Sequence, residues 1–192
     1  MKNQISTPNH IRIDSHRLFW KHGKDYYNWL TEDMQHKTID IDVDNICNKS
    51  HLRDISKIIL IQAMPNIQQT QHLLQLANSN ESILGVVACI DMCSVRAVSD
   101  IAAISNDPYL KGVRPTLQNT TDSDWLLDPK FTPVFNCLAN FELCFEALIK
   151  PRHLDYLLQL IEQFPKLKVA IDHLVKPKVT MKHFETWSKN IE

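Results

Sequence analysis

The stretch that decides the fold class is KIILIQAMPNIQQTQHLLQLANSNESILGVVACIDMCSVRAVSDIAAI, residues 57–104. Two short runs rich in Ile, Val and Leu predict strands, and each is followed by a longer segment whose apolar residues recur every three or four positions. The strands are expected at 57–62 and 83–90, and the helices at 67–77 and 95–104. Strands that alternate with helices in this way predict successive parallel β-α units rather than hairpins or a helical bundle.

The same alternation continues on both sides of this stretch. Further strands are predicted at 11–14, 111–117, 143–149 and 168–172, and further helices near 133–140, 152–164 and 182–189. The pattern therefore contains about six strand-plus-helix units, whereas a closed (β/α)8 barrel needs eight. Two α/β architectures stay open on pattern alone: an incomplete (β/α)8 barrel of the TIM type, and an open doubly wound sheet that can be complete with five or six strands.

Composition limits the class of protein. The 192 residues are 44% hydrophobic and 22% charged, with a formal net charge of −1, which predicts one globular domain over residues 1–192 and no nucleic-acid-binding surface. No apolar run approaches the roughly 20 residues that span a bilayer, and residues 1–5 lack the apolar core of a signal peptide. We expect a cytoplasmic protein without a membrane segment. Only three glycines occur, so a glycine-rich phosphate loop is excluded.

An ordered series of short motifs resembles the amidohydrolase-related lactonase family of the amidohydrolase superfamily. The motifs are IRIDSHRLFW (11–20), YNWL (27–30), ILIQAMPNIQQTQHLLQLA (59–77), GVRP (112–115), DWLLDP (124–129), FEALIKPRHL (145–154) and DHLVKP (172–177). This resemblance favours the (β/α)8 barrel, with two units missing, and not the doubly wound sheet. It also implies a hydrolase that acts on lactones, as the fuconolactonases, rhamnonolactonases and 2-pyrone-4,6-dicarboxylate lactonases of the family do.

The resemblance assigns the catalytic and metal-binding roles to histidines. His16 matches the first histidine of the family's opening strand and follows the predicted strand 11–14, and His173 matches the histidine that ends strand six. Both are expected to be catalytic and to bind a divalent metal, zinc or manganese. The family's second histidine, two residues after the first, is replaced by Leu18, which has no lone pair and weakens the expected metal site. Asp14 and Asp172 are expected to orient neighbouring groups.

Four other residues are predicted to contact substrate. Arg114 and Arg152 lie where the family places cations near acidic substrates, and a guanidinium binds a carboxylate bidentately. His153 follows strand five, and Gln62 ends strand two with an amide that suits sugar hydroxyls. For each of the four, a structural role is the alternative: an ion pair, a helix cap or a turn contact. The expected ligand is a small-molecule lactone or sugar acid.

Two departures from the family pattern lead us to expect impaired activity. Val175 stands where the family has glycine, so a positive φ there would strain the backbone. The superfamily's catalytic aspartate comes from strand eight, for which this sequence has no counterpart. Besides the hydrolase, two alternatives remain: a noncatalytic truncated remnant, and one half of a split enzyme that needs a second chain. In either case we expect the exposed barrel edges to favour self-association or binding of a complementing chain.

Overall fold

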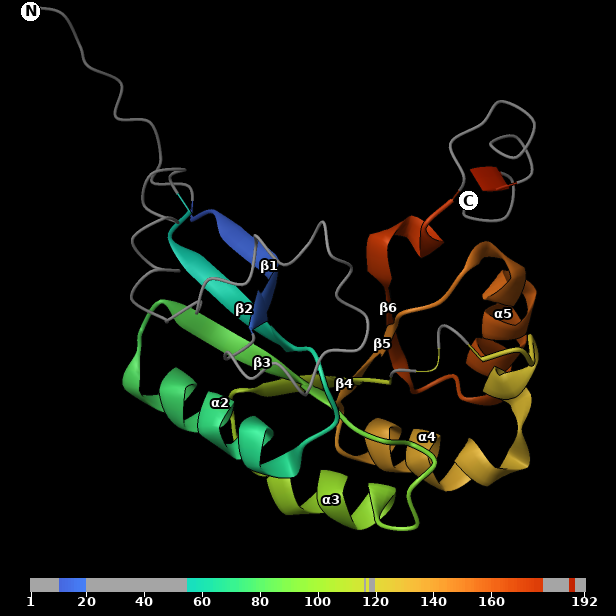
Figure 1. Cartoon of the computed structure of the whole chain (residues 1–192), viewed down its shortest axis with the longest axis horizontal. Coiled ribbons are helices and arrows are strands. Elements are labelled where there is room, and N and C mark those ends of the chain that lie inside the picture. The colour runs from blue at the N-terminus through green and yellow to red at the C-terminus, as the bar shows by residue number, and fades with distance from the viewer. Residues whose placement is uncertain (1–10, 20–54, 116, 118–119, 178–186, 189–192) are drawn as a thin grey trace, which may run out of the picture.

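The computed structural model describes residues 11–19, 55–115, 117, 120–177 and 187–188. Their main feature is one sheet of six parallel strands, in which each strand pairs with its neighbour in sequence. The strands are β1 (Ile13–Phe19), β2 (Lys57–Gln62), β3 (Ile83–Cys89), β4 (Leu110–Arg114), β5 (Cys144–Ala147) and β6 (Lys168–Ile171). The sheet curls into part of a barrel (Figure 1).

Helices cover the outer side of this curled sheet (Figure 1). They are α2 (Ile67–Ser79), α3 (Ala97–Ile104), α4 (Thr132–Asn140) and α5 (Leu154–Gln163). A doubly wound sheet reverses its strand order at a switch point and carries helices on both faces. The sequential order β1 to β6 has no such reversal, so the prediction of an incomplete (β/α)8 barrel is confirmed and the doubly wound alternative is wrong.

The core lies between the sheet and the helices. Apolar side chains of β2 to β5 pack against those of α2 to α5, and the three largest fully buried ones are Phe131, Phe135 and Phe145. Local signals place the helices. Asn66, for example, caps α2 by accepting a hydrogen bond from the Gln69 amide at 3.0 Å, which is the usual role of Asn before a first helical turn.

Two predicted strand boundaries were wrong in ways that matter for the site. The fourth strand stops at Arg114 instead of continuing to Leu117, because Pro115 has no N–H to donate to the sheet. The first strand spans Ile13–Phe19 rather than 11–14, and its register against β2 shifts between Asp14 and Arg17. His16 therefore lies inside β1, at a β-bulge, and not just past the strand.

The last predicted helix, 182–189, lies mostly outside the described residues, where only Trp187 and Ser188 are seen and are helical. The segment 20–54, which includes the YNWL motif, also lies outside them. Among the described residues, none of the helices is long and apolar enough to cross a membrane.

Candidate active site at the carboxyl ends of the strands

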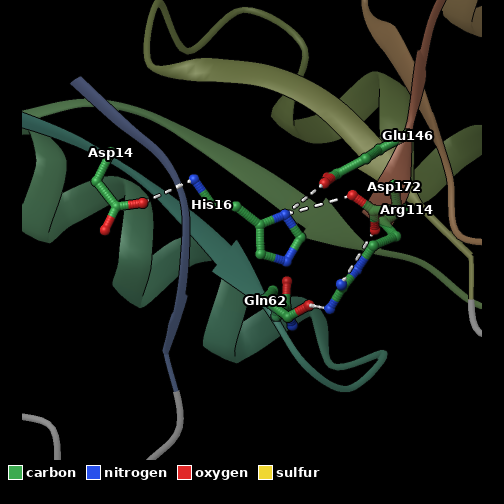
Figure 2. Close-up of polar contacts among 6 residues, drawn as sticks. All are labelled: Asp14, His16, Gln62, Arg114, Glu146 and Asp172. Carbon is green, nitrogen blue, oxygen red and sulfur yellow. Dashed lines mark hydrogen bonds and ion pairs between the residues drawn. The ribbon is translucent and has the colours of Figure 1, made fainter. Parts of the chain in front are cut away.

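The centre of the candidate site is the imidazole of His16 on β1. Its Nδ1 lies 3.2 Å from Oε1 of Glu146 on β5 and 3.3 Å from Oδ1 of Asp172, which directly follows β6 (Figure 2). The curl of the sheet therefore brings the first strand against the ends of the fifth and sixth. The bulge in β1 aims the ring: the His16 amide donates to Oδ1 of Asp14 at 3.1 Å, and bulges commonly re-aim side chains beside active sites.

Glu146 and Asp172 are both buried carboxylates, and their surroundings move their pKa values in opposite directions. Burial raises the pKa of Glu146 above its ordinary value, although the hydrogen bond to His16 acts against this. Burial would also raise the pKa of Asp172, but hydrogen bonds with His16 and Glu146 and the charges of His16 and Arg114 outweigh it and lower that pKa. Asp172 is thus the carboxylate that stays ionised.

The same contacts act on His16. Hydrogen bonds to Asp172 and then Glu146 raise the pKa of His16 to about 9, against the lowering effect of burial. In this structure the imidazole is therefore charged at neutral pH and forms an ion pair with the Asp172 carboxylate.

Arg114, the last residue of β4, joins three strands beneath this cluster. Its Nη2 donates to the carbonyl oxygen of Gln62 at the end of β2 at 2.9 Å, and its Nη1 lies 3.5 Å from Oδ2 of Asp172 (Figure 2). The side chain is buried, only 6% exposed. The structure thus gives Arg114 internal partners, and we assign it to positioning Asp172 rather than to a direct contact with substrate.

His173 lies in an unusual turn that follows β6. The four residues His173, Leu174, Val175 and Lys176 all have positive φ values, between 49° and 59°. The turn places the His173 ring against that of His16, with centroids 4.7 Å apart and planes at 64°. Burial lowers the pKa of His173, even though the nearby Asp172 acts to raise it. Val175 has φ 59°, so the backbone conformation that glycine adopts most easily is here adopted by a β-branched residue.

The donor set fits a divalent metal ion. One ligand atom each from His16, Asp172 and His173 can be chosen so that all lie within 4.8 Å of one another. Imidazole nitrogen and carboxylate oxygen are common zinc ligands, and ligands about 2.1 Å from a tetrahedral zinc lie roughly 3.4 Å apart. Within this cluster His16 Nδ1 and Asp172 Oδ1 lie 3.3 Å apart, and a metal ion held between them would replace the proton that now joins the two atoms. Oε2 of Glu146 is buried and has no hydrogen-bond partner among the described residues, so it is a further oxygen available there.

Leu18, two residues after His16 on β1, is half-buried and pairs with Ile61 of β2. It offers no ligand atom, so this chain cannot bind a metal ion through a pair of histidines on β1, as the family pattern does. The carboxylates of Asp172 and Glu146 supply oxygen atoms within 3.3 Å of His16 Nδ1.

Gln62 has structural partners for both atoms of its amide. Nε2 donates to the carbonyls of Met64 and Asn66 at 2.7 and 2.9 Å, and Oε1 accepts from Thr70 Oγ1 at 2.7 Å and from the Cys89 amide at 3.0 Å. These bonds fix the junction between β2 and α2 and leave little capacity for sugar hydroxyls. We therefore leave Gln62 out of the proposed substrate contacts.

His153 and Arg152 come from the 3-10 turn Pro151–His153 before α5. The His153 ring is buried, accepts the Lys150 amide at Nδ1 over 3.1 Å and packs edge-on against Trp125. Arg152 is exposed and donates to the carbonyl oxygen of Thr120 at 2.7 Å. Neither belongs to the cluster of His16, Asp172 and His173, so the structure does not bring all the predicted histidines together.

Sequence reasoning missed the part played by two carboxylates. Glu146 is a lone acid inside the apolar run CFEALI, a signal that could have marked it, because a charged residue on a buried strand usually has a specific partner. Asp172 was expected to orient its neighbours, and its contacts with His16 and Arg114 fit that role, but its place among the possible metal ligands was not predicted.

The curled parallel sheet and the cluster at the carboxyl ends of its strands define a (β/α)-barrel protein of the kind that carries its active site at that face. The chain belongs to the amidohydrolase family, whose sequence model matches residues 13–192. Two of its sequence relatives are L-fucono-1,5-lactonases.

Sequence relatives include an L-fucono-1,5-lactonase of Burkholderia ambifaria, 31% identical over 177 residues, a match that covers 92% of this chain and 61% of that protein. A solved amidohydrolase from Burkholderia multivorans with bound zinc superposes with a TM-score of 0.85 at 23% identity, covering 95% of this chain and 65% of that one. A probable 2-pyrone-4,6-dicarboxylic acid hydrolase from Acinetobacter baumannii, with citric acid bound, gives a TM-score of 0.68 at 16% identity, with the same two coverages of 95% and 65%. The chain thus spans less than two thirds of the length of these relatives.

Proposed function

We propose that this chain carries the active site of a hydrolase that opens sugar-acid lactones by attack of water on the ring ester. The observation that carries the proposal is the contact of His16 with two buried carboxylates, Asp172 and Glu146, beside His173. The 31% identity to an L-fucono-1,5-lactonase supports a lactone of a deoxysugar acid as the first substrate to test.

A divalent metal ion would be held by His16, Asp172 and His173. When bound, zinc or manganese would supply Lewis-acid polarisation of the lactone carbonyl. The amidohydrolase relative with bound zinc supports zinc as the first metal to test.

The side chains have separate tasks in this proposal. Without a metal, Asp172 stays ionised and holds the protonated His16 ring in place through Nδ1, and a bound metal ion would take the place of that proton. Oε2 of Glu146, without a partner among the described residues, is placed to accept a hydrogen bond from the attacking water or from a sugar hydroxyl. The exposed His173 ring is available to donate a hydrogen bond to the carbonyl oxygen as negative charge develops there.

The test is hydrolysis of a panel of sugar-acid lactones, beginning with L-fucono-1,5-lactone, by the purified chain with and without zinc or manganese. A pH indicator follows acid release, and buffer alone gives the spontaneous rate. We expect turnover above buffer that is lost in His16→Ala and kept in His72→Ala, because His72 lies exposed on α2. Turnover equal to buffer with every lactone and metal would contradict catalysis by this chain.

A second candidate is that full activity needs a complementing chain. Within the part of the chain that the structure describes, β1 and β6 are the edge strands, and apolar side chains are exposed at both: Ile11 and Ile13 at or before β1 are 67% and 50% exposed, and Ile171 and Leu174 at or after β6 are 40% and 58% exposed. Unpaired strands of this kind recruit further strands. A polypeptide comprising the last two β/α units of the related fuconolactonase should form a one-to-one complex by light scattering and raise turnover at least about tenfold. A compact monomer that forms no complex with this polypeptide would argue against the need for a complementing chain.

A further inference from the structure

The turn that carries His173 has a backbone conformation that its own residues do not favour. His173, Leu174, Val175 and Lys176 have φ values of 49°, 50°, 59° and 53°. Residues with a Cβ rarely adopt this left-handed region, and then usually singly; Asn, Asp and His do so more often than the others. Of the four residues only His173 is one of these types, so contacts with the rest of the structure must hold the turn in this shape.

Two contacts of the turn's own residues help to hold it. The side chain of Val175 is fully buried in the core, and the Lys176 amide donates to the carbonyl oxygen of His173 at 2.9 Å. The side chain of Leu174, which lies between His173 and Val175, is 58% exposed. Packing of that side chain therefore does little to fix the middle of the turn.

A third contact reaches the middle of the turn from outside. Nε1 of Trp187 donates to the carbonyl oxygen of Leu174 at 2.9 Å, and the Trp187 ring is partly buried against the same core that receives Val175. An indole has two side-chain torsions and a single N–H, so a packed ring presents its donor at a fixed place.

We infer that Trp187 is a positioning residue for the candidate site: its indole N–H holds the left-handed turn, and thereby keeps His173 against His16 and beside Asp172. This inference rests on the proposed function where it concerns metal binding. The placement of the two histidine rings in the metal-free protein is independent of that function.

The experiment compares Trp187→Phe with the matched control Trp125→Phe. Trp125 is also packed in the core, but its indole N–H has no hydrogen-bond partner among the described residues. Zinc affinity is measured by competition with a chromophoric chelator, and the histidine ring protons of the metal-free proteins are followed by NMR. We expect Trp187→Phe to weaken zinc binding about three- to tenfold, the effect of one hydrogen bond, and to shift or broaden the His173 ring signals. Trp125→Phe should leave both unchanged.

A rescue separates positioning from general packing. Asn adopts the left-handed region more readily than Leu, and the exposed side chain of residue 174 can be changed without opening the core. Adding Leu174→Asn to Trp187→Phe should restore zinc affinity to within about twofold of the wild type. If Trp187→Phe does not fold, replacing Trp187 with benzothienylalanine, which keeps the ring shape and lacks the N–H, takes its place.

Unchanged His173 signals in a folded Trp187→Phe or benzothienylalanine variant would overturn the inference, as would a loss of affinity that Leu174→Asn fails to restore. If the wild type itself binds no zinc, the metal part of the proposed function fails. The His173 signals of the metal-free variants then still decide the role of Trp187.

Discussion

Nη1 of Arg114 lies 3.5 Å from Oδ2 of Asp172, and both side chains are buried. The same guanidinium donates to the carbonyl of Gln62, so one side chain connects the ends of β2, β4 and β6. A buried carboxylate that loses its cationic neighbour is left uncompensated, which makes this contact a sensitive point for stability as well as for the site.

Replacing Arg114 with Met should lower the free energy of unfolding by about 3 kcal/mol, because Asp172 and the Gln62 carbonyl both lose a buried partner. Urea denaturation followed by circular dichroism measures this. The matched control is Arg152→Met, since Arg152 is exposed and donates to the carbonyl oxygen of Thr120. Its cost should stay below about 1 kcal/mol. Equal losses in the two variants would contradict a special role for Arg114.

Two glycines in neighbouring strands should respond differently to alanine. A Cβ at Gly112 on β4 would overlap the backbone carbonyl oxygen of Cys144 on β5, which cannot move without disturbing the strand pair. A Cβ at Gly85 on β3 would come closest to Cγ, Cε and Cδ of the exposed Lys111 side chain, which can turn aside by changing its χ1 rotamer. We expect Gly112→Ala to destabilise the protein by at least about 2 kcal/mol and Gly85→Ala by under about 1 kcal/mol, measured as urea midpoints. The reverse order would show that β4 and β5 are not held this closely.

Leu18→His should restore the missing second imidazole. Residues two apart on a strand point to the same side, so this side chain would share the face of His16. An added nitrogen ligand should tighten zinc binding at least about tenfold in a chelator competition assay. The control is Ser15→His, which adds the same group at an exposed position of the same strand. If both variants gain equally, the added histidine is not completing this site.

His153 gives a pH dependence of stability. Its burial, and then the charges of Arg152 and Lys150, lower its pKa to about 4, below its ordinary value of 6.5. As the pH falls below 6.5, His153 becomes protonated in the unfolded chain before it does so in the folded protein. The contribution of neutral His153 to the free energy of unfolding is therefore fully present above pH 6.5 and is lost as the pH falls toward 4. In His153→Gln, the free energy of unfolding should fall less steeply between pH 6.5 and 4, measured by urea denaturation at each pH. His72→Gln, at an exposed site on α2, should keep the wild-type slope.

Much of the fold could be predicted because strand and helix periodicities are local properties of the sequence. The runs 57–62 and 168–172 agree with the observed strands to within one residue, since short apolar runs with β-branched residues favour strands. The length of β1 could not be predicted, because its bulge inserts a residue that only the pairing with β2 defines. The single-domain and cytoplasmic assignments stay predictions.

The candidate site was less predictable, because it depends on which strand ends the curled sheet brings together. His16 and His173 were identified by their match to family motifs, and the structure places their rings side by side. The partners of His16 were not identified: its contact with Glu146 links β1 to β5, strands far apart in the sequence and not neighbours in the sheet. No local pattern encodes such a contact. The structural contacts of Gln62 and His153 likewise arise from packing around them.

The sequential strand order also bears on how the protein acquires this site as it folds. Each strand pairs with the one made just before it, so the sheet can grow one unit at a time, with mostly short loops to close. The contact between His16 and Asp172 is different, because it joins the first strand of the sheet to the end of the last. It can form only after β6 has been added and the curl is complete. The candidate site is therefore formed late in folding. A ribosome-bound chain that ends before β6 could form part of the sheet but not the contact between His16 and Asp172.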